Sequence, residues 1–286
     1  MVRHLVEQNM FRVTDVADIN LDNLGQVLER DSVAFVRGLI DPEEVRRFKA
    51  SFEKQFDQGA DRPGTGETPE EIMGHLQKLS IGGAAQSGVY RPRFFRTIYT
   101  PLWGRDRYGF HRIIRQTCKL RNHMYGRPLD FAIDEVEDGL WTAARVHHYP
   151  SGGGFLVGHR DTVVPRVHEE VGLGHFYQII IVLSKAGEDF DEGGGFVELD
   201  GERLYFEQEC ELGDIAIYDS RTIHGVEDVD PKKVYDPTSP AGRIAGFVTL
   251  YRDIRNAKKL YPGYLLNEHN EDLAQGIEFD RASGES

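Results

Sequence analysis

Six short runs rich in β-branched and aromatic residues constrain the fold of this chain more than any other sequence feature. Glycine, aspartate and proline separate the runs, which cover residues 142–149, 175–184, 195–199, 203–206, 214–218 and 244–251. Many short strands with turn residues between them are typical of an antiparallel sandwich or barrel. The pattern therefore predicts a β core over residues 129–252.

Helical patterns dominate the part of the chain that precedes this core, apart from a short apolar run over residues 32–39 that predicts a strand. Asp41 is followed by Pro42 and two glutamates, a combination that is typical of a helix start. Val45, Phe48 and Phe52 then form an apolar stripe at helical spacing. We expect a mainly β fold with helices packed on it.

The chain has 286 residues, which is compatible with one large domain. We expect a single domain over residues 1–275, with a helical part over 1–128 followed by the β core. The polar end of the chain, residues 276–286, is predicted to be a disordered tail.

Composition excludes several classes of function. Lys and Arg number 34 against 47 Asp and Glu, so the net charge of −13 disfavours nucleic acid as a partner. The longest apolar run, near residues 179–183, is too short for a membrane span. The two cysteines exclude a disulfide scaffold, so a reducing cytoplasm is the expected location.

A candidate metal site begins with His159-Arg160-Asp161. On an extended segment, residues i and i+2 share a face, so the imidazole and the carboxylate can bind one ion. His159 follows a glycine-rich turn, whereas the competing pairs His168/Glu170 and His269/Glu271 lie in a predicted loop and in a polar C-terminal stretch. His224, which follows an apolar strand, is the candidate third ligand. Two histidines and one carboxylate leave open positions that suit Fe(II) and oxygen chemistry.

Arg243 stands at the start of the apolar run that continues to Tyr251. An arginine at the mouth of a buried strand is costly to bury without a partner. Its guanidinium group matches a carboxylate in shape and charge. An exposed arginine at a strand end is the alternative.

Four segments in order resemble the iron(II)/2-oxoglutarate-dependent oxygenases, close to the prolyl-hydroxylase-like and phytanoyl-type branches. They are Tyr149 to Asp161, Glu192 to Phe196, Gly213 to His224 and Arg243 to Tyr251. The resemblance implies a double-stranded β-helix core, also called a jelly roll or cupin-like fold, with N-terminal helices packed on one side.

By this resemblance, His159, Asp161 and His224 are the Fe(II) ligands. Arg243 matches the residue that pairs with the distal carboxylate of 2-oxoglutarate, and Tyr149 matches a tyrosine that contacts this co-substrate. The implied activity is a dioxygenase that uses O2 and 2-oxoglutarate, releases succinate and CO2, and hydroxylates an unactivated carbon.

Strand alternation offers an indication of the substrate. Arg145, His147 and Tyr149 share one strand face, and Gln178 faces the same way on the next predicted strand if Tyr149 faces the metal. Arg145, His147 and Gln178 then predict a small polar or anionic substrate, such as an amino-acid derivative, a sugar acid or a biosynthetic intermediate. Structural polar groups or co-substrate contacts are the alternative for these three.

Other functions remain compatible with the same residues. The same metal chemistry supports desaturation, cyclisation or epimerisation, since the outcome depends on how the substrate lies. A jelly-roll protein that binds a metal or ligand without turnover, or a zinc hydrolase, is a further alternative. Arg243 argues against both, because neither needs an anchor for a co-substrate.

Overall fold

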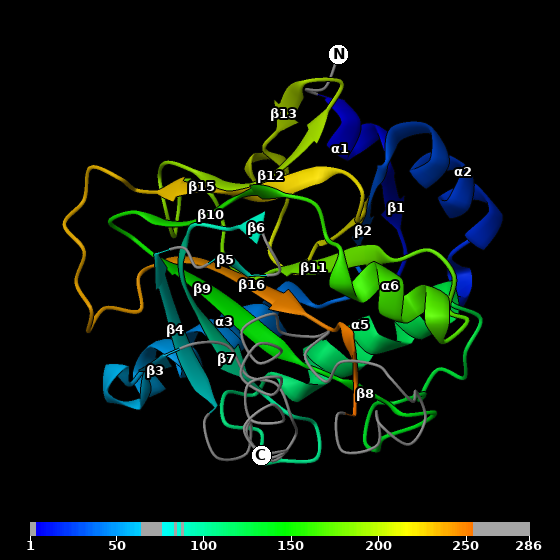
Figure 1. Ribbon diagram of the computed structural model, residues 1–286, viewed down its shortest axis with the longest axis horizontal. Coiled ribbons are helices and arrows are strands. Elements are labelled where there is room, and N and C mark those ends of the chain that lie inside the picture. Colours follow the sequence, from blue (N-terminus) through cyan, green and yellow to red (C-terminus); the bar gives the residue numbers. More distant parts are fainter. Residues whose placement is uncertain (1–3, 64–75, 83–84, 87–88, 254–286) are drawn as a thin grey trace, which may run out of the picture.

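The computed structural model describes residues 4–63, 76–82, 85–86 and 89–253 (Figure 1). The predicted tail over residues 276–286 lies outside these ranges. The helices are α1 (Leu5–Gln8), α2 (Leu21–Asp31), α3 (Pro42–Gln55), α5 (His111–Met124) and α6 (Val163–Glu170), with 3-10 turns η2 (Val16–Asp18), η3 (Gln58–Ala60) and η4 (Phe206–Gln208).

The strands follow in two groups. Those before residue 128 are β1 (Met10–Arg12), β2 (Val33–Arg37), β3 (Arg62–Pro63), β4 (Gln77–Gly82), β5 (Ala85–Gln86), β6 (Val89–Tyr90) and β7 (Arg93–Tyr99). Those after it are β8 (Leu140–Thr142), β9 (Arg145–Pro150), β10 (Gly154–His159), β11 (Tyr177–Val182), β12 (Gly194–Leu199), β13 (Glu202–Leu204), β14 (Ile215–Asp219), β15 (Ile223–Val229), β16 (Gly242–Phe247) and β17 (Leu250–Arg252).

The order of the strands defines a double-stranded β-helix. Along the sheet, the strands after β8 form two blocks, β14-β11-β16-β9 and β10-β15-β12-β13, which are joined through β7. Along the chain, the strands from β9 to β16 alternate between these blocks, starting with β9 in the first and β10 in the second, except that β12 and β13 form a hairpin within the second block. The sheet curls so that the two blocks face each other (Figure 1). The predicted jelly-roll architecture is confirmed.

The N-terminal part contributes more than helices. Strands β1 and β2 extend the first block beyond β14, and β4 and β7 extend the sheet beside β9. The strand predicted over residues 32–39 corresponds to β2, whereas β7 was not predicted, because Arg93 and Arg96 interrupt its apolar pattern. One continuous sheet therefore runs through both parts of the chain.

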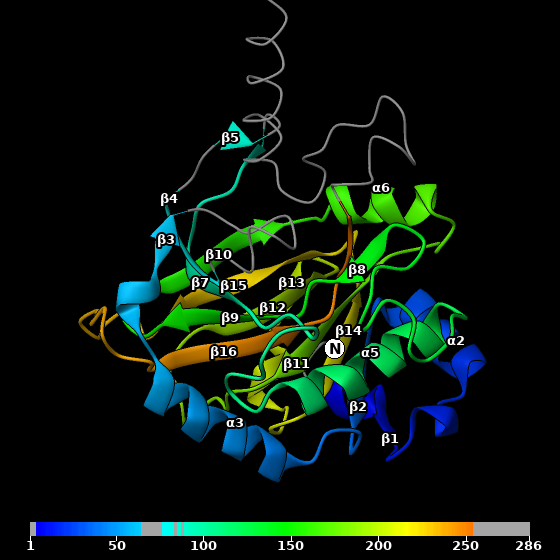
Figure 2. The same cartoon turned by 90° about the horizontal axis from the view of Figure 1, so that it is seen from below.

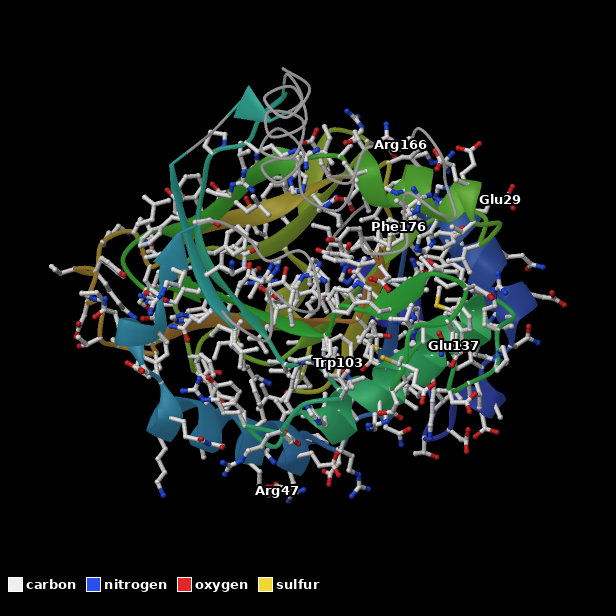
Figure 3. All side chains as sticks on the ribbon, turned by 60° about the horizontal axis from the view of Figure 1, so that its bottom comes forward. Glu29, Arg47, Trp103, Glu137, Arg166 and Phe176 are labelled. Carbon is white, nitrogen blue, oxygen red and sulfur yellow. The ribbon has the colours of Figure 1, made fainter. Side chains whose placement is uncertain are left out.

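Helix α3 forms where the capping pattern predicted it. The Asp41 side chain accepts a hydrogen bond from the Glu43 backbone N–H at 2.9 Å, with Pro42 in the first turn. Phe48 and Phe52 are fully buried, whereas Arg47 lies on the outer side of the helix (Figure 3). The helix therefore buries one stripe and keeps its charged side in solvent.

Helices α3 and α5 lie together against one face of the first block, as Figure 2 shows. Alternate residues of the strands, such as Val146, Ile181 and Ile244, pack in the same hydrophobic cluster as Phe48 and Ile113. The residues between them point into the space enclosed by the two blocks. Within the described residues, no helix combines the length and the apolar character that crossing a bilayer requires.

Candidate metal centre and adjoining cavity

The two candidate histidines meet because their strands pair. β10 and β15 run antiparallel, and His159 lies directly opposite His224 in the register. Gly225 allows this close approach, since a Cβ atom there would lie 2.6 Å from the Leu156 carbonyl oxygen. Asp161 follows β10 by two residues, and its backbone N–H donates to the Ser220 carbonyl at 3.1 Å.

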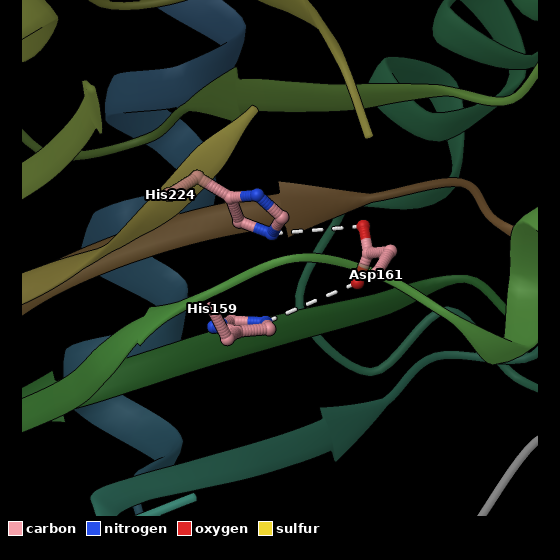
Figure 4. A group of neighbouring side chains, drawn as sticks. All are labelled: His159, Asp161 and His224. Atoms are coloured by element: carbon pink, nitrogen blue, oxygen red, sulfur yellow. Dashed lines mark ion pairs between the residues drawn. The ribbon is translucent and has the colours of Figure 1, made fainter. Parts of the chain in front are cut away.

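The three side chains converge on one point (Figure 4). His159 Nε2 lies 3.9 Å from Asp161 Oδ1, and His224 Nε2 lies 3.6 Å from Asp161 Oδ2. All three candidate ligand atoms lie within 4.8 Å of one another, and no other such group occurs in the described part of the chain. Small side-chain movements would bring them onto a single ion.

Hydrogen bonds orient both imidazole rings. His159 Nδ1 lies 2.9 Å from the Val157 carbonyl, and His224 Nδ1 lies 2.9 Å from the Thr222 carbonyl. Each Nδ1 therefore carries the hydrogen, and each Nε2 presents its lone pair toward Asp161. Ring nitrogens that donate to backbone carbonyls in this way are the usual support for metal-binding histidines.

The electrostatics of the cluster suit a cation. Burial and then the nearby His224 lower the pKa of His159 to about 4, so its ring is neutral at neutral pH. The Asp161 Oδ2 atom is buried and has no hydrogen-bond partner. A buried carboxylate oxygen without a partner is costly unless a cation balances it. The donor set, two imidazoles and one carboxylate, fits Fe(II).

The competing histidine pair has a different role. His168 and Glu170 lie on helix α6, where the sequence analysis expected a loop, because Pro165 stands in its first turn and the helix tolerates it there. The His168 ring contacts the rings of Tyr125 and Phe176. Glu170 pairs with Arg252 at 2.8 Å. His269 and Glu271 lie outside the described residues.

All eight residues that the sequence analysis singled out line one cavity of about 110 Å³: His159, Asp161, His224, Arg243, Tyr149, Arg145, His147 and Gln178. One water needs roughly 10–15 Å³ measured in this way, so the cavity has room for a small ligand. Inward alternation on β9, β11 and β16 places five of them there, and the pairing of β10 with β15 adds His159 and His224, with Asp161 two residues further on. The role of each residue stays a prediction.

Arg243 is buried and paired. Its Nε donates to Glu207 Oε1 at 2.9 Å and to Oε2 at 2.8 Å, and its Nη2 donates to Oε1 at 2.6 Å. The Nη1 atom is buried without a partner. Sequence reasoning missed Glu207, since a glutamate in the 3-10 turn η4 carries no local signal of a partner 36 residues away.

Tyr149 lies between Arg243 and the aromatic wall of the cavity. Its ring stacks on Phe95 with centroids 5.0 Å apart, and the Arg243 guanidinium lies over it at 4.9 Å. Burial raises the pKa of Tyr149 to about 12, so its hydroxyl stays protonated. The hydroxyl oxygen lies 3.5 Å from His147 Nδ1, which can donate to it because His147 Nε2 accepts from Arg145, so the hydroxyl can donate its own hydrogen to a ligand.

Arg145 and His147 continue the polar row along β9. Arg145 Nε donates to His147 Nε2 at 3.2 Å, and Nη1 and Nη2 donate to the Ala143 carbonyl and to Thr249 Oγ1. All of these acceptors are neutral, and no carboxylate of a described residue pairs with Arg145 within 4 Å. Burial and then Arg145 hold the pKa of His147 well below its usual value.

Tyr218 is a cavity residue that the sequence analysis did not select. It lies on β14 with its ring centroid 4.9 Å from that of His224. Burial, followed by the Asp161 charge, keeps the pKa of its hydroxyl well above the usual value. Tyr218 lies opposite Gln178 in the β11–β14 register, so pairing the two predicted strands would have indicated it as a cavity residue.

Comparison with known proteins gives no match at the level of sequence. No family model and no curated protein matches this chain. Similar solved structures include a prolyl hydroxylase from Trichoplax adhaerens in complex with a hypoxia-inducible-factor peptide (11% identity, 81% of this chain, 89% of that chain, TM-score 0.48). A 2OG-Fe(II) oxygenase family protein from Burkholderia pseudomallei (12%, 85%, 95%, 0.43) and a Pseudomonas putida prolyl-4-hydroxylase (13%, 80%, 98%, 0.46) are also similar.

Proposed function

We propose that this protein is an Fe(II)/2-oxoglutarate-dependent dioxygenase that hydroxylates a small polar or anionic molecule. The observation that carries this proposal is the shared cavity. A candidate triad of two imidazoles and a carboxylate and a buried guanidinium with a free Nη1 line the same space. A metal site alone would need no such cation, whereas a keto acid with a second carboxylate does.

In this proposal His159, Asp161 and His224 hold Fe(II) through Nε2, a carboxylate oxygen and Nε2. Bound Fe(II), with 2-oxoglutarate and O2, supplies the oxidising power for C–H hydroxylation, and succinate and CO2 are released. The carbonyl contacts of both Nδ1 atoms keep the two rings in the tautomer that can bind the ion.

The other cavity residues would orient the two organic molecules. Arg243 Nη1 and the Tyr149 hydroxyl would donate to the distal carboxylate of 2-oxoglutarate. Arg145, whose hydrogen-bond acceptors among the described residues are all neutral, would attract an anionic group of the substrate, with His147 and Gln178 as neutral polar contacts. Fixing both molecules in one cavity would favour the reaction by proximity.

The test is succinate formation from 2-oxoglutarate with Fe(II), O2 and a panel of amino-acid derivatives, sugar acids and neutral analogues. We expect substrate-dependent succinate release that His159→Ala abolishes. Mass spectrometry of the product separates the chemical outcomes: a gain of one oxygen atom indicates hydroxylation, a loss of two hydrogens indicates desaturation or cyclisation, and an unchanged mass indicates epimerisation. Metal binding without binding of 2-oxoglutarate would contradict the proposal and favour a metal-binding protein or a zinc hydrolase.

A further inference from the structure

The Arg243 guanidinium is held on several sides. Glu207 occupies the edge formed by Nε and Nη2, and the ring of Tyr149 lies against its face. The backbone of β12 closes another side, because a Cβ atom on Gly195 would lie 2.9 Å from Arg243 Nη2. The guanidinium therefore has little freedom to rotate.

Glu207 is itself fixed in place. Its Oε2 accepts the Gly195 backbone N–H at 2.7 Å in addition to the bonds from Arg243. The Glu207 and Arg243 side chains are only 2% and 1% exposed. Arg243 lines the cavity and Glu207 does not, so the carboxylate supports the guanidinium from the side away from the ligand space.

One donor group of Arg243 is left without a partner. Its Nη1 is buried and makes no hydrogen bond, although Nε and Nη2 both donate to Glu207. Buried guanidinium donors are nearly always satisfied. An acceptor on a ligand in the cavity would complete the set.

We propose that Glu207 is a positioning residue for co-substrate recognition. By holding the Nε–Nη2 edge of Arg243, Glu207 directs Nη1 toward the cavity, where it donates to the distal carboxylate of the keto acid. This inference rests on the proposed function and deepens it. Glu207 touches neither the metal nor the ligand, so its effect is on the orientation of Arg243 alone.

The test compares two keto acids on the Mn²⁺-loaded protein by titration calorimetry. 2-Oxoglutarate carries the distal carboxylate, and 2-oxopentanoate has the same chain length without it. For Glu207→Ala, we expect the Kd of 2-oxoglutarate to rise about tenfold, the loss of one well-oriented charge-assisted hydrogen bond. The Kd values of 2-oxopentanoate and of Mn²⁺ should stay unchanged.

Two further variants make the test robust. Glu207→Gln has the shape of the native side chain and one acceptor oxygen, so it should fold if the alanine variant does not and should show an intermediate rise in Kd. Asp214→Asn is the matched control. It weakens the partly buried pair between Asp214 and Arg37, which has the same edge-on geometry but does not line the cavity. It should lower the melting temperature without changing the Kd of 2-oxoglutarate.

The outcomes are distinguishable. If folded Glu207 variants bind 2-oxoglutarate with unchanged or lower Kd, the positioning role is overturned, and Glu207 serves only as a structural partner or as a competing charge. If the wild-type protein binds 2-oxoglutarate no better than 2-oxopentanoate, the proposed function itself fails at Arg243.

Discussion

The two faces of strands β9 and β16 differ in chemistry although adjacent residues supply them. On the outer face, Val146 and Ile244 pack in the hydrophobic cluster that includes helices α3 and α5. On the inner face, Arg145, His147 and Arg243 line the cavity. Both faces are buried, so they differ not in exposure but in the contacts and hydrogen-bond partners available to their side chains.

The apolar side chains of the outer face have the contacts that they need, whereas some polar atoms in the cavity lack hydrogen-bond partners. Apolar side chains need only contact, which the helices provide. In the cavity, Asp161 Oδ2 and Arg243 Nη1 are buried without hydrogen-bond partners. Such atoms destabilise a fold unless a ligand satisfies them. A single strand can therefore stabilise the fold through one face and present polar atoms to a ligand on the other, because alternation keeps the two sets of side chains apart.

Asp161→Ala should have the largest effect on function. Loss of the carboxylate removes one of three candidate ligands, and we expect succinate formation to fall below detection and Mn²⁺ binding to weaken by at least about tenfold. The thermal stability of the metal-free protein should change little, since Asp161 Oδ2 has no hydrogen bond to lose. Glu170→Ala, from the competing His-x-Glu pair, is the control for metal binding. Wild-type Mn²⁺ affinity in Asp161→Ala would show that Asp161 is not a metal ligand.

Phe48→Ala tests the outer face. Its side chain is fully buried against Phe52, Tyr108 and Phe110. The cavity left by the ring should lower the free energy of unfolding by about 3–5 kcal/mol, measured by denaturant titration.

The folded fraction of Phe48→Ala should retain Mn²⁺ affinity, because α3 does not line the cavity. The neighbouring Arg47→Ala, on the exposed side of the helix, should change the free energy by less than about 0.5 kcal/mol. A large loss of metal affinity in the Phe48 variant would show that the two faces are not independent.

His168 is also buried without a hydrogen-bond partner for its ring, but it lies outside the cavity. Burial, and then Arg121, lower its pKa to about 3. The unfolded chain, in which histidine titrates near 6.5, therefore takes up this proton first as the pH falls. The contribution of His168 to stability is complete above about pH 6.5 and is lost progressively toward pH 3, by up to about 1.4 kcal/mol per pH unit.

His168→Leu should remove this part of the acid sensitivity. The free energy of unfolding of the metal-free variant, measured from pH 7 to pH 4.5, should fall less steeply than that of the wild type by roughly one proton's slope. His147, His148 and His159 titrate in both proteins, so the difference between the two curves isolates His168. Parallel curves would mean that His168 is protonated equally in the folded and unfolded states.

Arg145→Gln should give the smallest of these effects. We expect kcat/KM for an anionic substrate to fall about tenfold, equivalent to about 1.4 kcal/mol, with the KM for 2-oxoglutarate unchanged. A neutral analogue of the same substrate should be affected less. An equal loss for charged and neutral substrates would assign Arg145 to the structure of the cavity, together with its contacts to Phe247 and Tyr251.

Local patterns predicted much of the fold. The cap at Asp41 and the stripe with Phe48 and Phe52 correspond to α3, and each of the six β-rich runs overlaps one of the strands β9, β11, β12, β13, β14 and β16. The start and type of α6 were not predicted, because Val163 to Glu170 has few residues and a proline. Strand β7 was missed because its buried Arg96 depends on a tertiary partner, Asp61 at 3.0 Å, which no local pattern indicates.

The amino-acid sequence by itself determined which side chains share a strand face, because the i, i+2 spacing of an extended chain is local geometry. It thereby indicated His159 with Asp161, and Arg145 with His147 and Tyr149. Only the tertiary structure decided which faces meet: the register that sets His159 opposite His224, and the pairing of Arg243 with Glu207. Register and long-range pairs depend on how whole strands fit together, which no local spacing specifies.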